Sequence, residues 1–352
     1  MKKKELQGVK EIARRANVAI ATVDRVIHNR TGVSAKTREK INKIIAELNY
    51  QPNLLARQLA SGKIISIAVL IPSVTEETDF WEAPLQGIQQ AEAEIRSYGI
   101  NINLFFFELN NPNSFITQAN KILDSTVDGI VLAPSFVDEA QEFTTTCQQK
   151  GIPFVFIDAD IPGQESLSYI GPPLFQSGYL AGKLSTYKLR EASKLLVVNI
   201  ATSLDSFTYK QIEEGFRTYF TDHKLKYPIL RADIQQTDFA SIAHYLQELF
   251  DANTDIDAVF VSNSRVFSVA RFLNSRQSFQ KPLLIGYDFV NENIRYLANG
   301  TIDFLICHQP KDQGYRSIMA LYQHLVLLAP IAKEYYMPID IVTQENQAFY
   351  RN

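Results

Sequence analysis

The chain has 352 residues, 46% of them hydrophobic and 21% charged, values typical of a soluble globular protein with two or three domains. No run of about 18 apolar residues occurs, and no apolar segment follows the lysine-rich start, so we expect a cytoplasmic protein without membrane span or signal peptide. The two cysteines, Cys147 and Cys307, show no metal-binding spacing and predict buried thiols; we expect neither metal nor cofactor.

The net charge of −3 hides an uneven distribution. Residues 1–63 contain 14 basic and 5 acidic side chains, whereas the rest of the chain contains 21 basic and 33 acidic ones. A basic N-terminal segment on an acidic body indicates that the segment binds a polyanion such as nucleic acid. The alternative at this point is a lysine-rich solubilising tail.

Residues 9–61 predict four short helices, at 9–16, 20–28, 35–48 and 53–60. Apolar residues recur at helical spacing in the first three, Ser34 is suited to cap the third, and Pro52 suits the start of the fourth. Two short helices joined by a tight turn and followed by a third predict a helix-turn-helix.

The second helix of such a motif lies in the major groove of DNA. Ile20 and Ala21 are expected to contact a thymine methyl group, and Arg25 to bind a guanine. Asp24 can accept from a cytosine amino group, although it repels phosphate. The predicted phosphate contacts are Thr22, His28, Asn29 and Arg30.

The stretch VKEIARRANVAIATVDRVIHNRTGVSAKTREKINKIIAELNYQPNLLARQLASGK resembles the LacI family of bacterial regulators. The resemblance implies that the fourth helix is a hinge that inserts into the minor groove, with Leu59 as the wedge and Asn53 and Ala56 facing the groove or the partner hinge. Simple packing within the hinge is the alternative for Leu59. Ala19 and Asp24 both depart from the family pattern, which has serine at each position, so the operator is expected to differ.

From Ile64 onward, short apolar runs alternate with amphipathic stretches. We predict strands at 64–72, 102–109, 127–134, 152–160, 194–201, 257–263, 283–288 and 303–308. The predicted helices are 83–98, 114–124, 139–150, 176–188, 209–222, 239–250 and 313–328. This alternation predicts doubly wound α/β structure with buried parallel strands.

Ligands of such sheets bind beyond the carboxyl ends of the strands. Polar residues gather at those ends: Asp158, Asp160, Asn199, Asn263, Asp288 and His308. Strand alternation would put Asp158 and Asp160 on the same side, where they could bind a polyol or act as an acid–base pair. The sequence contains no GxSxG, P-loop, GxGxxG or HExxH motif, and no residue is spaced to orient His308, so we expect no enzyme.

The body resembles the periplasmic-binding-protein type I fold, in the branch that includes ribose-binding proteins, through FWEAPLQGIQQAEAE, IPFVFIDAD, VFVSN, IGYD and HQPKDQG. This resemblance implies a sugar pocket between two lobes, built from Phe80, Trp81, Asp158, Asp160, Lys210, Phe239, Asn263, Asp288 and His308. The open alternatives are plain packing for Phe80 and Trp81 and a structural turn for Asp288. Ala159 stands where ribose binders carry arginine, so we expect a neutral sugar other than ribose, and a pocket that disfavours anions.

The expected organisation is a helix-turn-helix domain at 1–50, a hinge at 51–63 and a two-lobed ligand-sensing domain at 64–352. Its N-lobe is expected at 64–172 and 309–337, and its C-lobe at 173–308 and 338–352. The expected partners are double-stranded operator DNA, a small effector and a second copy of the chain in a homodimer; whether the effector releases or tightens DNA stays open. Other readings are a cytoplasmic sugar-binding protein without DNA reading, a transporter's solute-binding protein, and a sugar-converting enzyme.

Overall fold

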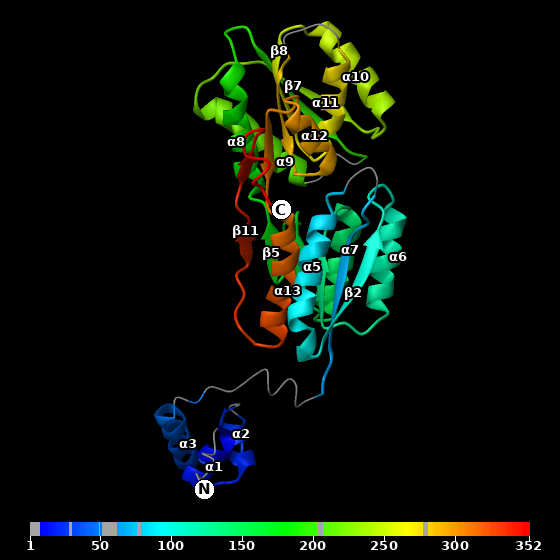
Figure 1. Cartoon of the computed structure of the whole chain (residues 1–352). Helices are drawn as coiled ribbons and strands as arrows, with labels where there is room; N and C mark the ends of the chain where they lie inside the picture. Colours follow the sequence, from blue (N-terminus) through cyan, green and yellow to red (C-terminus); the bar gives the residue numbers. More distant parts are fainter. Residues whose placement is uncertain are drawn as a thin grey trace. The chain divides into compact units, whose positions relative to one another are not determined.

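The computed structural model describes residues 8–27, 30–48, 50, 62–75, 79–202, 207–276 and 281–352. The chain divides into two compact units, Met1–Gly62 (the N-terminal unit) and Lys63–Asn352 (the C-terminal unit). Figure 1 shows the helices of the first unit and the two sheets of the second. Among the described residues, no helix is long and apolar enough to cross a membrane.

The N-terminal unit contains α1 (Val9–Ala16), α2 (Ile20–Ile27) and α3 (Ala35–Glu47). Ile12, Val23 and Ile41 are fully buried where the three helices meet. Asn17 adopts the left-handed conformation (φ 57°) that turns the chain between α1 and α2. The three predicted helices are confirmed to within about a residue where they are described, whereas the predicted hinge helix at 53–60 lies outside the described residues.

The first sheet of the C-terminal unit, which with its helices forms the first lobe, has the strand order β11-β5-β4-β3-β1-β2. All of its pairings are parallel. Its strands are β1 (Ile65–Pro72), β2 (Ile100–Phe107), β3 (Gly129–Leu132), β4 (Phe154–Ile157), β5 (Ser168–Gly171) and β11 (Glu334–Tyr336). The central strands β3 and β4 are wholly buried, as their unbroken apolar runs predict.

Helices cover both faces of this sheet (Figure 1). On one face, α6 (Pro112–Leu123) and α7 (Val137–Gln149) bury Phe115 and Phe143 against the strands. On the other face, α5 (Glu82–Ile95), followed by the short η1 (Arg96–Tyr98), packs against α13 (Pro310–Leu325). Gly87 allows this contact, because a Cβ atom there would lie 1.9 Å from the carbonyl oxygen of Lys311.

The second sheet, which forms the second lobe with its helices, has the order β12-β10-β9-β8-β6-β7. Its strands are β6 (Lys194–Ile200), β7 (Ile229–Ile234), β8 (Ile256–Val261), β9 (Leu283–Tyr287), β10 (Phe304–Cys307) and β12 (Asp340–Val342). One face packs on α8 (Leu174–Ser185), followed by η2 (Thr186–Lys188), and on α9 (Phe207–Asp222). The other face packs on α10 (Phe239–Ala252), α11 (Val266–Ser275) and α12 (Asn291–Ala298).

The chain passes between the two sheets three times: after β5, after β10, and between β11 and β12. Gln309 lies at the second passage with a left-handed backbone (φ 48°), and its side chain donates to the Asp340 carboxylate at 2.9 Å. These passages bring the carboxyl ends of strands from both sheets to one place.

The predicted α/β fold is confirmed, with one correction to the parallel sheet: β12 runs antiparallel to β10. The sequence analysis also missed β5, β7, β11, β12, α11 and α12. Strand β7 is an edge strand whose exposed positions include Arg231, so it offers no continuous apolar run. Cys147 and Cys307 are both buried, as expected.

Candidate ligand site and DNA-reading surface

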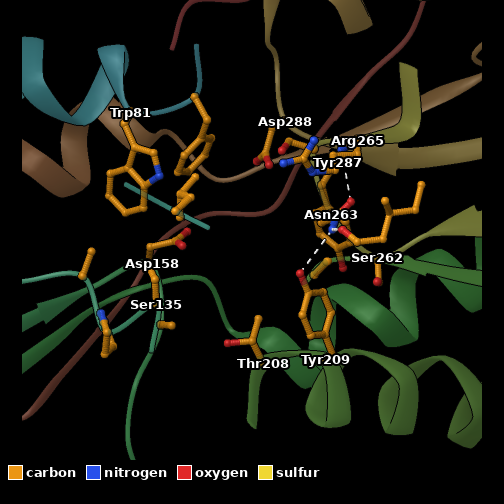
Figure 2. A pocket seen from close by; sticks show the side chains of 18 of the residues that line it. Trp81, Ser135, Asp158, Thr208, Tyr209, Ser262, Asn263, Arg265, Tyr287 and Asp288 are labelled. Carbon is orange, nitrogen blue, oxygen red and sulfur yellow. Dashed lines mark hydrogen bonds between the residues drawn. The ribbon is translucent and has the colours of Figure 1, made fainter. Parts of the chain in front are cut away.

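A cavity of about 240 Å³ lies between the two lobes, at the carboxyl ends of their strands (Figure 2). The first lobe contributes an aromatic pair before α5 and the residues that follow β3, β4 and β5. The second lobe contributes the residues that follow β6, β8, β9 and β10. Its polar and aromatic lining includes Phe80, Trp81, Asn110, Ser135, Asp158, Thr202, Thr208, Tyr209, Thr237, Ser262, Asn263, Arg265, Tyr287, Asp288 and His308.

Asp158 enters the cavity from the first lobe because the strand ends just before it. β4 stops at Ile157, and Asp158 has a left-handed backbone (φ 68°), a conformation that aspartate tolerates better than most residues. Its backbone N–H donates to Oε1 of Gln313 at 3.2 Å, and its carbonyl accepts from the Tyr169 hydroxyl at 3.3 Å. The expected alternation of Asp158 and Asp160 is therefore wrong, and Asp160 lies outside the described cavity lining.

Asp288 enters from the second lobe in the same way. It follows β9 with φ 72°, and the buried side chain of Asn293 donates to its carbonyl at 3.0 Å and to that of Tyr287 at 2.9 Å. The same amide donates to the carbonyl of Ser264 at 2.9 Å. One buried asparagine thus fixes two of the loops that line the cavity.

The two carboxyl groups share an electrostatic environment that favours their protonated forms. Burial raises the pKa of Asp158 to about 6. Burial and then the charge of Asp158 raise the pKa of Asp288 well above its ordinary value. Among the described residues, neither side chain makes a hydrogen bond or an ion pair, so their oxygens face the cavity without a protein donor.

Phe80 and Trp81 form the aromatic wall of the cavity, with ring centroids 5.2 Å apart and planes at 89°. Just before them, the Asp79 carboxylate reaches the other lobe. Its Oδ2 accepts from the backbone N–H of Asn291 at 3.2 Å and from the side-chain amide of the same residue. The two lobes are thus joined at α12 as well as by the chain passages.

Asn263 and Arg265 belong to the turn between β8 and α11. The Asn263 amide donates to the carbonyl of Ile200 at 2.7 Å and to the Tyr209 hydroxyl at 3.2 Å, and its Oδ1 accepts from the backbone of Arg265 at 3.1 Å. Arg265 lines the cavity, and its charge acts to lower the pKa of Tyr209 against the stronger effect of burial. The cavity therefore contains an arginine, although Ala159 stands where ribose binders carry one.

His308 lies at the chain passage after β10. It is 4% exposed, its ring stacks on Tyr287 with centroids 5.6 Å apart, and its Nε2 has no hydrogen-bond partner among the described residues. Burial lowers the pKa of His308 to about 3, so the imidazole is neutral at physiological pH. It can accept or donate one hydrogen bond without adding charge.

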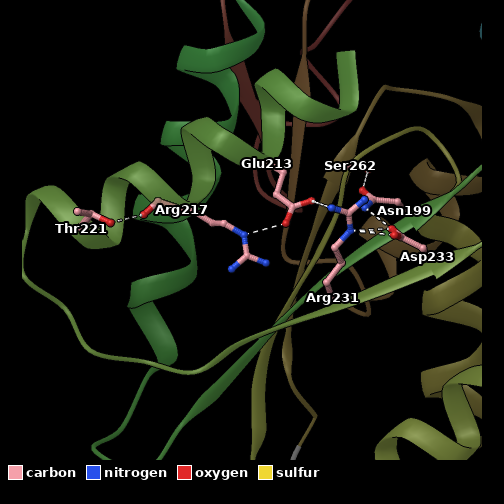
Figure 3. Close-up of polar contacts among 7 residues, drawn as sticks. All are labelled: Asn199, Glu213, Arg217, Thr221, Arg231, Asp233 and Ser262. Carbon is pink, nitrogen blue, oxygen red and sulfur yellow. Dashed lines mark hydrogen bonds and ion pairs between the residues drawn. The ribbon is translucent and has the colours of Figure 1, made fainter. Parts of the chain in front are cut away.

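A polar chain runs from the cavity through the second lobe to its surface (Figure 3). The Ser262 hydroxyl contacts Oδ1 of Asn199 at 2.5 Å, and the Asn199 amide donates to Asp233 at 2.8 Å. The Arg231 guanidinium then donates to the Asp233 carboxylate at 2.9 Å and forms an ion pair with the Glu213 carboxylate at 3.2 Å. Asn199 is fully buried, so water cannot supply the hydrogen bonds that its side chain makes to Ser262 and Asp233.

We expect Asn199→Leu to destabilise the C-terminal unit by about 2 kcal/mol, because the substitution leaves two polar partners without their bonds in or near the core. Urea denaturation followed by circular dichroism measures the change. Gln247→Ala is the control, since that exposed side chain hydrogen-bonds to Asp251 on the same helix and its loss should change stability by less than about 0.5 kcal/mol. Equal stability of the two variants would contradict the structural role of Asn199.

Six of the nine predicted ligand residues line the cavity: Phe80, Trp81, Asp158, Asn263, Asp288 and His308. Asp160, Lys210 and Phe239 lie outside its described lining. Lys210 is exposed on α9, and Phe239 at the start of α10 packs on the second-lobe core beneath Arg271, 3.8 Å from the ring centroid. Sequence reasoning missed Tyr209 and Arg265, although both are neighbours or near neighbours of predicted residues.

On the N-terminal unit, α2 exposes the side chains expected to read DNA. Ile20 is 51% exposed, Ala21 and Arg25 are exposed, and Thr22 and Asp24 are half-buried. Arg30 donates to the Asp24 carboxylate at 3.1 Å, which offsets the negative charge on this surface. His28, Asn29, Asn53, Ala56 and Leu59 lie outside the described residues.

Two domain families match this chain. Residues 8–53 match the bacterial regulatory proteins of the lacI family, and residues 67–326 match the periplasmic binding protein domain. Catabolite control protein A of Staphylococcus epidermidis is 26% identical over 216 residues, which cover 61% of this chain and 62% of that protein. The Staphylococcus aureus protein of the same name is 31% identical over 145 residues, 41% of this chain and 42% of that protein. The chain thus spans less than two thirds of these relatives.

Solved structures show the same fold. A protein from Bacteroides fragilis, assigned as a LacI transcriptional regulator, superposes with a TM-score of 0.76 at 28% identity and covers 82% of this chain and 100% of that one. GanP, a glucose-galactose binding protein from Geobacillus stearothermophilus, superposes with a TM-score of 0.72 at 21% identity over 81% and 99% of the two chains. The chain therefore belongs to the periplasmic binding protein domain family, and it carries a regulatory domain of the bacterial lacI family at residues 8–53.

Proposed function

We propose that this protein is a transcriptional regulator whose affinity for operator DNA is controlled by a sugar bound between its two lobes. The observation that carries the proposal is that one chain has both a lacI-family domain at 8–53 and a cavity between two lobes that carboxyl, amide and aromatic groups line. Such a lining suits a polyhydroxylated ligand. The proposed division is 1–50 for DNA reading, 51–63 for the hinge and 64–352 for sensing.

In this proposal α2 enters the major groove. Ile20 and Ala21 contact thymine methyl groups and Arg25 binds a guanine edge, while Thr22 and Arg30 position the helix on phosphates with His28 and Asn29. Leu59, with Asn53 and Ala56, acts in the minor groove. Asp24 orients Arg30 rather than reading a base, because the two side chains already form an ion pair.

The regulator acts as a homodimer on a near-palindromic site, since a two-fold pair of α2 helices matches two half-sites. Sugar binding changes the angle between the lobes, and this movement alters the distance between the two hinges. Coupling of this kind is typically worth about 1–3 kcal/mol. Asp79 and Asn291, which join the lobes, lie where such a movement must break or form a contact.

Fluorescence anisotropy with the full chain and a fragment of its own upstream DNA tests this function, at two salt concentrations and with a panel of sugars. We expect salt-sensitive binding that one sugar alters. Arg25→Ala should weaken binding roughly 5- to 150-fold, since one bidentate base contact is worth about 1–3 kcal/mol. Arg295→Ala, on the surface of α12, is the matched control and should leave DNA binding unchanged.

Sugar binding without DNA binding at either salt concentration would contradict the regulator and would support the alternative, a sugar-binding protein that does not read DNA. Conversion of a bound sugar to product would support an enzyme instead. Equal loss of DNA binding in Arg25→Ala and Arg295→Ala would refute the assignment of α2 as the reading helix.

A further inference from the structure

The cavity holds two carboxyl groups that have no protein partner. Asp158 follows β4 in the first lobe and Asp288 follows β9 in the second, and both are partly buried and line the cavity. Burial disfavours the ionisation of both, and the charge of Asp158 further disfavours that of Asp288. Buried carboxylates in proteins are generally paired, so a pair without protein partners points to a group from outside the chain.

Other enclosed carboxylates of the C-terminal unit are paired within the chain. Asp128 accepts from Lys63 at 2.8 Å and from the backbone of Ser66 at 3.0 Å. Asp257 accepts from Arg190 at 2.9 Å and from the Ser193 hydroxyl at 2.6 Å. Structural carboxylates in this fold thus receive a cation and a second donor, which Asp158 and Asp288 lack among the described residues.

Nearby cavity groups do not supply that cation to the two carboxyls. His308 is neutral, because burial lowers its pKa to about 3. Neither Asp158 nor Asp288 forms an ion pair with Arg265 in the described part of the chain, and burial is the first cause of the raised pKa of both carboxyls. The aromatic wall of Phe80 and Trp81 adds electron-rich rings, which also favour a cation.

We propose that the ligand is an amino sugar whose protonated amino group is held between Asp158 and Asp288; this rests on the proposed function, that the cavity binds a sugar. An ammonium group has three donors and can serve both carboxylates, while it removes the repulsion between the lobes. Hydroxyl groups could bond the oxygens, but only a cation would also stabilise the ionised form of both carboxyls, which burial disfavours. The remaining hydroxyls of the sugar would meet Asn263, Tyr209 and His308.

Isothermal titration calorimetry with the full chain at pH 7 tests this ligand class. The probes are glucosamine, galactosamine and mannosamine, each against its parent hexose and its N-acetyl derivative, which has the nitrogen but no charge. We expect at least one amino sugar to bind roughly tenfold or more tighter than both of its neutral counterparts, as expected for charge-assisted bonds in an enclosed site.

Asp158→Asn and Asp288→Asn keep the shape of the site and remove one charge each, so each should abolish the preference for the amino sugar. Asp160→Asn is the matched control, since Asp160 belongs to the same loop but lies outside the described lining. Thermal unfolding of each variant checks that it folds. If the variants do not fold, the comparison of amino and neutral sugars on the unmodified chain still tests whether the site prefers an amino sugar.

Equal or tighter binding of the neutral sugars would overturn the proposal, and so would the absence of amino-sugar binding at millimolar concentrations. The DNA-binding assay separates this inference from the proposed function. A neutral sugar that alters DNA affinity would uphold the regulator and refute the amino sugar. An amino sugar that binds with the expected preference but leaves DNA affinity unchanged would uphold the ligand class and refute the regulator.

Discussion

Gly87→Ala should destabilise the C-terminal unit by about 4 kcal/mol or more, a large share of the roughly 5–15 kcal/mol that holds a protein folded. The new Cβ would lie 1.9 Å from the carbonyl oxygen of Lys311 and 2.8 Å from the backbone nitrogen of Tyr315. Both atoms belong to the backbone of α13, so no side-chain rotation relieves the overlap. The helices must move apart, and the first lobe loses packing along their whole contact.

Thermal unfolding followed by circular dichroism measures this effect, and we expect a fall in Tm of about 10 °C or more, or insoluble protein. Gln89→Ala, which adds the same residue to an exposed position of α5, is the control and should leave Tm nearly unchanged. Gly314→Ala should resemble Gly87→Ala, because its Cβ would lie 2.1 Å from the carbonyl oxygen of Pro84. A normal Tm for both glycine variants would show that α5 and α13 pack less closely than described.

The second large effect is on stability as a function of pH. Asp158 has a pKa raised from 3.8 to about 6, so the folded unit binds a proton more tightly than the unfolded chain. The stabilisation linked to that proton is fully present below pH 3.8 and is lost as pH rises through 6. The loss amounts to about 3 kcal/mol at pH 8. Asp158→Asn has no carboxyl group to ionise at this position, so the variant avoids this loss and should be more stable than the parent at pH 8.

Urea denaturation at pH 5 and pH 8 measures the difference, which should be about half as large at pH 5. Other groups around Asp158 do not reproduce this dependence: Tyr169 and Tyr209 titrate at higher pH, and His308 titrates near pH 3. Asp288→Asn should act in the same direction, because burial and then the charge of Asp158 raise the pKa of Asp288 well above its ordinary value. A gain in stability that is independent of pH would contradict the raised pKa.

Continuous apolar runs predicted the buried strands of both sheets because a strand covered on two faces must be apolar throughout. Strands β1, β4 and β9 are examples, and each is described within a few residues of its predicted range. The edge strand β7 was not predicted, because a strand that is covered on one face only lacks such a continuous apolar run. β7 needs apolar residues on one face only, and its other face carries Arg231 and Asp233.

The strand ends also predicted much of the cavity, since Asp158, Asn263 and Asp288 all follow buried strands. What the sequence could not predict was the direction of the backbone after each strand. The positive φ of Asp158 ends the alternation on which Asp160 was placed, and the turn before α11 brings Arg265 into the lining. Both depend on contacts with distant residues, such as Gln313 for Asp158.

Both sheets have the same strand order, which gives the cavity an approximate internal symmetry. The residues after β3 and β8, after β4 and β9, and after β5 and β10 come as three related pairs, and Asp158 and Asp288 form the middle one. A sugar has no matching two-fold axis, so a cavity whose pairs were chemically identical would accept it in two opposite orientations. The choice between them falls to pairs whose members differ in chemistry, such as Phe136 and Arg265, which directly precede α7 and α11.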